Sequence, residues 1–174
     1  RSVTVTTHIL MAMQKARIPV VRLNGGFLYD SQEYKLILSS CKIGLHKETT
    51  YDVKRVLPLL GIDSSKHTEI KKYAVTNHMP YFTAVLRMIA VDKRDDAAKL
   101  IEAIKNILTD NMSTFIRALW RYGLSSYISD EENQRRDEIL SQLPPGITPA
   151  DWLDAIDAQR KEYAAMMELA SKKD

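Results

Sequence analysis

Helical spacing of apolar residues from residue 49 onward constrains the fold of this chain more than any other feature. The clearest case is residues 95–109, where apolar side chains recur three or four positions apart, as one face of an α-helix does. Similar spacing predicts further helices over residues 50–60, 65–76, 80–91, 112–122, 130–143 and 149–171. The sequence therefore predicts a mainly α-helical, multi-helix domain.

Capping and breaking residues mark the ends of several of these helices. Thr49, followed three positions later by Asp52, has the pattern of a capping box at a helix start. Pro58 is expected to interrupt the helix that follows, and Gly61 to end it. Thr148 before Pro149 is a second strong start, because proline suits the first turn of a helix.

The first 45 residues carry a different pattern, which predicts a small β element of a hairpin or short strands. Residues 3–7 are β-branched, and residues 18–23 and 27–29 flank the turn sequence Asn24-Gly25-Gly26. Residues 33–43 are ambiguous, since their apolar side chains partly alternate, while Asp30 or Ser31 followed by Glu33 could also cap a helix. A strand is favoured there because apolar residues flank small ones.

With 174 residues, the chain is about one domain in length. We expect residues 1–143 to form the β element and a helical core. Residues 144–174 follow with a Pro144-Pro145-Gly146 hinge and a C-terminal helical arm of the same domain. Apolar residues on the predicted helix faces should form the core: Leu57, Leu60, Phe82, Leu86, Ile89, Leu100, Ile104, Leu108, Ile116, Leu119 and Trp120.

Charge is divided unevenly along the chain. Residues 1–91 hold 13 Lys/Arg and 6 Asp/Glu, a net charge of +7, whereas residues 92–174 hold 12 and 16, a net charge of −4. The basic part could face a polyanion, or basic and acidic faces of neighbouring copies could meet. The alternative without functional meaning is a solvated surface on which charges are segregated.

Residue patterns of catalysis and metal binding are missing from the sequence. A single cysteine, Cys41, excludes a disulfide or a cysteine-based zinc site within one chain, and it is expected to be a structural thiol. His8, His46, His67 and His78 have no metal-ligand spacing. We therefore predict a non-enzymatic protein with no cofactor and no metal. An enzyme with a dispersed site stays open as an alternative, because catalytic groups need not be neighbours in sequence.

The setting of the protein is expected to be intracellular. No apolar run approaches the roughly 18 residues that a membrane-spanning helix needs. A secretory signal is not recognisable, and one free cysteine agrees with a reducing compartment. We therefore expect no membrane association and a cytoplasmic location, or the virion if the protein is viral.

Basic and tyrosine side chains are the remaining candidates for function. Lysines and arginines neutralise phosphates, and tyrosines can stack on unpaired bases, a combination that suits single-stranded nucleic acid. A helix-turn-helix over residues 50–76 is disfavoured, since Pro58 interrupts its first helix and its second has no base-reading run. The candidate residues are Arg17, Arg22, Lys35, Tyr51, Lys54, Arg55, Lys66, Lys71, Lys72, Tyr73, Arg117 and Arg121.

Blander interpretations of these residues remain. The tyrosines could be half-buried edges of the core and the lysines ordinary solvated charges, or the whole set could face an acidic protein. Arg117 and Arg121, one helical turn apart beside Trp120, could pair with acids of the 130–143 helix or line a phosphate groove.

The predicted function is therefore binding of nucleic acid by a self-associating protein of the nucleocapsid or replication-associated type. Single-stranded nucleic acid is the expected partner, with RNA favoured, and the protein is expected to form a homo-oligomer. The alternative is a protein-interaction or scaffold module that docks through its C-terminal helix into the groove of a partner.

Overall fold

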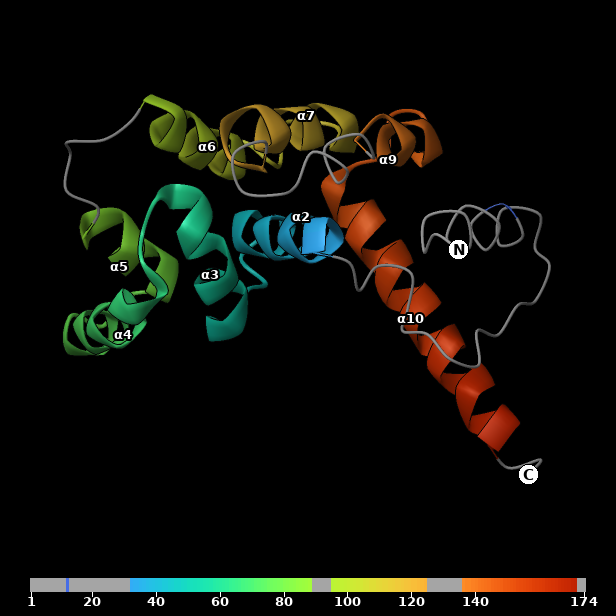
Figure 1. Cartoon of the computed structure of the whole chain (residues 1–174), viewed down its shortest axis with the longest axis horizontal. Helices are drawn as coiled ribbons and strands as arrows, with labels where there is room; N and C mark the ends of the chain where they lie inside the picture. The colour runs from blue at the N-terminus through green and yellow to red at the C-terminus, as the bar shows by residue number, and fades with distance from the viewer. Residues whose placement is uncertain (1–11, 13–31, 89–94, 125–135, 172–174) are drawn as a thin grey trace, which may run out of the picture. The chain divides into compact units, whose positions relative to one another are not determined.

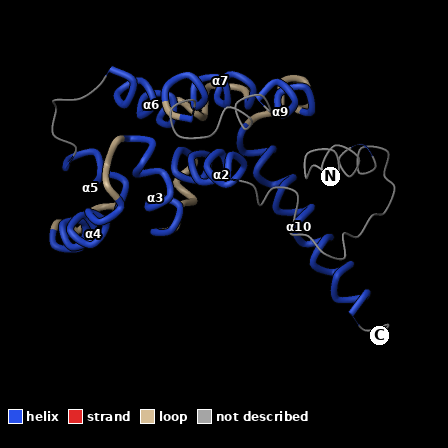
Figure 2. Tube along the Cα trace, viewed as in Figure 1, coloured by secondary structure: helices blue, strands red, loops and turns tan. Residues whose placement is uncertain are grey.

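A computed structural model of the chain describes residues 12, 32–88, 95–124 and 136–171. These residues form eight α-helices and two short 3₁₀ helices, and Figure 2 shows only helix and loop among them. The chain divides into two compact units, one of residues 32–153 and one of residues 1–31 with residues 154–174.

Consecutive helices pack in pairs within the unit of residues 32–153. The pairs are α2 with α3, α4 with α5, and α6 with α7, and further contacts join α2 to α6, α3 to α5, and α7 to α9 (Figure 1). The elements are α2 (Gln32–Gly44), α3 (Thr50–Val56), η2 (Leu57–Leu60), η3 (Ser64–Lys66), α4 (His67–Thr76), α5 (Tyr81–Met88), α6 (Asp95–Lys105), α7 (Met112–Tyr122) and α9 (Arg136–Gln142). The last helix, α10 (Pro149–Ser171), has only its first residues in this unit.

Several helix starts and stops from residue 49 onward agree with the predictions, although α6 ends at Lys105, short of the predicted residue 109. The Thr49 hydroxyl accepts a hydrogen bond from the Asp52 backbone N–H, and the Asp52 carboxylate accepts one from the Thr49 backbone N–H, which confirms the capping box. At Pro58 the α-helix gives way to the 3₁₀ turn η2, which ends at Gly61 in a left-handed conformation, with φ of 72°. The predicted start of the last helix at Pro149 is confirmed as well.

The predicted strand over residues 33–43 is wrong, because these residues form helix α2. Nearly every side chain from Leu36 to Ile43 is buried, so the segment has no polar face from which helical period could be recognised. The small β element predicted for the first 45 residues is not confirmed, since the described residues contain no strand. Its remaining segments, residues 3–7, 18–23 and 27–29, lie outside the described residues.

The core contains most of the apolar residues that the helix faces predicted. Leu57, Leu60, Phe82, Leu100, Ile104, Ile116, Leu119 and Trp120 are all buried. Leu108 is an error of the prediction, as its side chain is 75% exposed. Helix α6 ends at Lys105 and a turn follows, so Leu108 no longer lies on the apolar face of the helix. Leu86 is only half-buried, and Ile89 lies outside the described residues.

Three helical segments end in the same hydrogen-bonded turn, the Schellman motif. At the end of α4 the backbone N–H of Met79 bonds to the Ala74 carbonyl, and that of His78 bonds to the Val75 carbonyl. The ends of α2 and η2 repeat this pattern, with His46 and Gly61 at the position that His78 occupies in α4. This position requires positive φ, which is 56° at His46 and 49° at His78. Histidine there is strained relative to glycine.

Replacing His46 or His78 by glycine is therefore expected to stabilise the fold. Glycine removes the cost of the left-handed conformation, and part of that gain is offset by the greater freedom of the unfolded chain, so each variant should gain about 0.5 kcal/mol. Urea unfolding followed by circular dichroism measures this change. A loss of stability in both variants would contradict the prediction, since each imidazole would then contribute more to stability than the left-handed backbone costs.

Candidate functional site

A cluster of basic residues lies where α3, α4 and α5 meet. Its members are Lys54 from α3 and both His67 and Lys71 from α4, and we call them the α3–α4 basic surface. Partial burial, followed by the positive charges of Lys54 and Lys71, lowers the pKa of His67 below its ordinary value. The two lysines are thus close enough to act on the same imidazole, although 17 residues separate them in sequence.

His67 is fixed in place by Tyr81 of α5. The Tyr81 hydroxyl lies 2.6 Å from His67 Nδ1 and also donates to the His67 backbone carbonyl at 3.3 Å. The two rings meet edge to face, with centroids 5.5 Å apart. Partial burial raises the pKa of the Tyr81 phenol, so the hydroxyl remains protonated near neutral pH. This contact fixes the orientation of the imidazole.

Both lysines of this surface are available to an anion. Lys54 and Lys71 are exposed, and within the described ranges no carboxylate lies within ion-pairing distance of either ammonium group. Neighbouring positive charges repel one another, and a bound polyanion would relieve that repulsion. The α3–α4 basic surface is therefore a place where negative charge is favoured.

Tyr51 and Arg55 of α3 form a stacked pair next to Lys54 in sequence. The Arg55 guanidinium carbon lies 4.4 Å from the centre of the Tyr51 ring, a cation–π contact. Arg55 also donates from Nη1 to the Ser39 hydroxyl at 3.1 Å, and Ser39 in turn donates to the Asp52 carboxylate at 2.9 Å. Tyr51 is still 65% exposed, so an aromatic ring is accessible beside a fixed positive charge.

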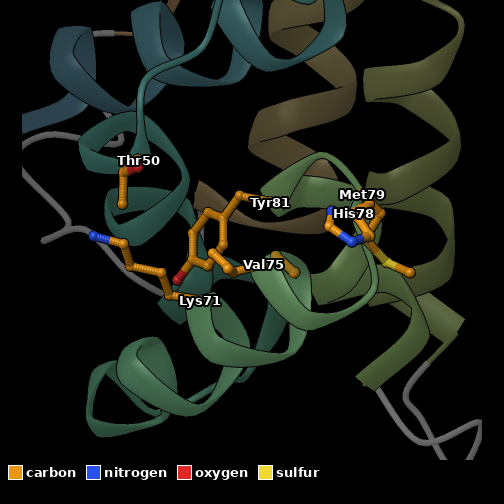
Figure 3. Close-up of a pocket in the computed structure, with 7 residues that line it drawn as sticks. Thr50, Lys71, Val75, His78, Met79 and Tyr81 are labelled. Atoms are coloured by element: carbon orange, nitrogen blue, oxygen red, sulfur yellow. The ribbon is translucent and has the colours of Figure 1, made fainter.

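A pocket of about 460 Å³ opens between α3, α4 and α5 (Figure 3). In Figure 3, Lys71 and Thr50 lie on one side of Tyr81 and Val75, and His78 and Met79 lie on the other. The pocket thus combines a cation and hydroxyls with apolar surface, the mixed lining that small-ligand sites have. Its lining residues are Thr50, Lys71, Ala74, Val75, His78, Met79 and Tyr81.

The other predicted residues of this region differ in their availability. Lys66 forms an exposed ion pair with Glu69 at 2.8 Å, so its charge is partly neutralised. Lys35 and Tyr73 are half-buried, whereas Lys72 is exposed on α4. Arg17 and Arg22 lie outside the described residues.

Arg117 and Arg121 lie in a second basic cluster, on α7 and α9. Together with Trp120 and Arg136 they line a recess of about 300 Å³. Arg136 forms an ion pair with its neighbour Asp137, with Nε 3.0 Å from Oδ1. This ion pair, with a smaller contribution from the charge of Arg117, lowers the pKa of Asp137. Among the described residues of the 130–143 region, the predicted pairing of Arg117 with an acid is seen as this longer-range attraction to Asp137.

Several site residues were missed by sequence reasoning. Thr50, His67, His78 and Tyr81 meet only through packing of α3, α4 and α5, and no spacing signal connects them. Arg136 could have been found, because the Arg135-Arg136 pair is visible in the sequence and Arg136 begins helix α9.

Other chemistry has little support in the described part of the chain. Cys41 is fully buried, its Sγ lies 3.9 Å from Met112 Sδ, and burial raises the pKa of its thiol far above neutrality, so it is a poor nucleophile. Within the described ranges, no group of three or more His, Cys, Asp or Glu side chains could hold a metal ion. Among the same residues, no helix combines the length and apolar character that crossing a membrane requires.

Comparison with known proteins adds no relative. The chain matches no protein-family model, no curated protein and no solved structure.

Proposed function

We propose that this protein binds single-stranded nucleic acid through the α3–α4 basic surface, without catalysing a reaction. The observation that supports this most is the convergence of Lys54 and Lys71 on His67 with no carboxylate paired to either lysine within the described ranges. Two unneutralised ammonium groups suit successive phosphates of a strand. RNA is the favoured ligand, and the proposed setting is intracellular.

The aromatic and apolar groups nearby would contact the bases. Tyr51 offers an exposed ring for stacking, and Arg55 beside it adds a fixed positive charge. The pocket lined by Val75 and Met79 next to Lys71 could accept a base while the ammonium group contacts its phosphate. Stacking and phosphate contacts tolerate any sequence, so binding should have little sequence preference.

Loss of two lysine charges should weaken binding strongly. We expect the Lys54→Glu/Lys71→Glu variant to bind a fluorescently labelled poly-uridine or poly-thymidine strand on the order of 100-fold more weakly in 50 mM salt, because attraction becomes repulsion. The slope of log affinity against log salt should also become shallower by about 1.4, which corresponds to two lost contacts on a single strand. Fluorescence anisotropy measures both quantities.

A matched control separates a local surface from general charge. Lys105→Glu/Lys161→Glu makes the same change of net charge at two exposed lysines on α6 and α10. It should retain most of the affinity. Equal losses in both variants, or wild-type binding that is insensitive to salt, would refute the proposed surface. Circular dichroism of each variant checks that helix content is unchanged.

Self-association is part of the same proposal. It is supported by the charge division of +7 and −4 along the chain, which lets unlike faces of two copies attract. A test must spare the start of α10, since Trp152, Leu153 and Ile156 are buried. Removal of residues 158–174 therefore tests the arm without removing these side chains. Light scattering with the absorbance ratio at 260 and 280 nm reports assembly and co-purified nucleic acid together.

The outcome of that truncation distinguishes the two functions predicted from sequence. A shortened chain that is monomeric and still binds nucleic acid would assign the arm to assembly. A chain that binds no nucleic acid with or without the arm would remove the proposal and favour the scaffold alternative, in which the helix docks into a partner.

A further inference from the structure

The recess between α7 and α9 combines three positive charges with an apolar wall. Arg117 and Arg121 lie one turn apart on α7, and Arg136 is the first residue of α9. Trp120 is only 3% exposed, so its indole forms a fixed, largely dehydrated wall of the recess. Arginines that lie in one recess repel one another, and an anion bound among them would replace this repulsion with attraction.

Charge in the recess is only partly balanced. Among the described side chains, the Asp137 carboxylate is paired with Arg136 and is itself exposed at the surface. Among the side chains that the structure describes here, three guanidinium groups stand against this one carboxylate, which is a net charge of +2. Within the described residues, Arg117 and Arg121 have no carboxylate within ion-pairing distance.

Guanidinium geometry and this net charge select the ligand. Arginine presents a planar set of donors that matches the oxygens of a phosphate, often through two hydrogen bonds. A phosphate monoester carries close to two negative charges at neutral pH, whereas a phosphodiester in a nucleic-acid backbone carries one. A net charge of +2 therefore matches a monoester better than a strand backbone.

Size limits the rest of the ligand. A volume of about 300 Å³ is at the lower end of small-molecule sites, enough for a phosphate and one attached group of nucleoside size. We propose that the recess lined by Arg117, Trp120, Arg121 and Arg136 is a binding site for a phosphate monoester no larger than a mononucleotide. This site is on different helices from the α3–α4 basic surface, and it stands whether or not that surface binds a strand.

Two simple probes test the charge argument on the full chain. Methyl phosphate is a monoester and dimethyl phosphate is a diester, so they differ mainly in charge and one methyl group. At pH 8 and low salt, isothermal titration calorimetry should show that methyl phosphate binds at least about tenfold more tightly. Fluorescence of Trp120 should change during the same titration, since its indole is part of the wall. Equal affinity for the two probes would overturn the proposal.

A double variant tests the residues. Arg117→Gln/Arg121→Gln should bind methyl phosphate at least about tenfold more weakly, because glutamine carries no charge and its shorter side chain offers fewer hydrogen-bond donors than arginine. Arg87→Gln, at an exposed arginine of α5, is the matched control and should bind as the wild type does. Wild-type affinity in the double variant, with helix content unchanged, would overturn the assignment of the site.

A third comparison identifies the source of the phosphate. A short oligonucleotide with a 5′-phosphate is compared with the same oligonucleotide ending in a hydroxyl. Tighter binding of the phosphorylated strand that is lost in Arg117→Gln/Arg121→Gln would identify the strand end as the ligand. Equal binding of both strands, with methyl phosphate still bound, would identify a small phosphorylated molecule.

Discussion

Replacing Gly44 by alanine is expected to destabilise the protein by about 3 kcal/mol, one of the largest effects that a single methyl group can have. Gly44 is the last residue of α2 and lies against α6. A Cβ atom at this position would lie 2.5 Å from the Ile104 backbone carbonyl oxygen and 2.6 Å from Ile107 Cγ2. Because the first obstacle is backbone, α2 and α6 would have to move apart.

The sign of this effect is informative as well as its size. In an unobstructed helix, alanine is about 1 kcal/mol more favourable than glycine, so a destabilised variant must be reporting a steric conflict. Gly123→Ala is the matched control: the nearest obstacle there, apart from its own helix, is the end of the Leu100 side chain at 2.9 Å, which can rotate. Its cost should be about 1 kcal/mol.

Urea unfolding measured by circular dichroism compares the two glycine variants directly. A Gly44→Ala protein that is as stable as the wild type would show that α2 and α6 are not as close as the structure places them. Equal costs at Gly44 and Gly123 would remove the distinction between backbone and side-chain obstacles.

Removing the Asp52 side chain should lower the free energy of unfolding by about 3 kcal/mol. The substitution removes one half of the capping box and breaks a buried hydrogen-bond network. One carboxylate oxygen accepts hydrogen bonds from the Thr49 backbone N–H and hydroxyl, at 2.9 and 2.8 Å. The other accepts one from the buried Ser39 hydroxyl at 2.9 Å. Asp52→Ala leaves the Thr49 backbone N–H and the Ser39 hydroxyl without this acceptor.

An exposed cap is the appropriate control for Asp52. Asn111 caps α7 by accepting a hydrogen bond from the Thr114 backbone N–H at 2.9 Å, and that bond is exposed to solvent. Asn111→Ala should cost about 1 kcal/mol, because water can replace the lost acceptor. If Asp52→Ala costs no more than Asn111→Ala, the buried network contributes nothing beyond ordinary capping.

Asp52 also gives the protein a defined sensitivity to acid. Burial alone would raise the pKa of this carboxyl, but hydrogen bonds from Thr49 and Ser39, with the charge of Lys42, outweigh burial and hold the pKa below its ordinary value of 3.8. The stabilisation is therefore complete above pH 3.8 and is lost as the pH falls through the lower pKa of the folded protein. In the Asp52→Asn variant, the free energy of unfolding should fall less steeply than in the wild type as the pH is lowered from 6 to 2.

Local signals explain why the helices from residue 49 onward could be predicted. Capping residues and breakers such as Thr49, Pro58 and Pro149 act on the nearest few residues, so their effect is visible in the sequence. Helix α2 was missed for the opposite reason. Its Leu36, Ile37 and Cys41 are all fully buried, and a helix covered on all sides presents no polar stripe.

The candidate sites were predictable only in part. The gathering of Lys54 and Lys71 followed from their density in two adjacent helices, and the structure places both near one histidine. The contact of His67 with Tyr81 depends on how α4 packs on α5, which no local pattern encodes. The hydrogen bond from Arg55 to the Ser39 hydroxyl likewise depends on the packing of α2 against α3. Because α2 itself was not predicted as a helix, this contact could not be predicted either.

The position of Cys41 determines what kind of bond can join two copies of this protein. It is the only cysteine of the chain, and in the folded state its sulfur is sealed in the interior against Met112. Folded chains therefore have no accessible thiol to offer one another, so a disulfide would not join them. A covalent dimer on a non-reducing gel would therefore have formed from chains that had unfolded far enough to expose Cys41.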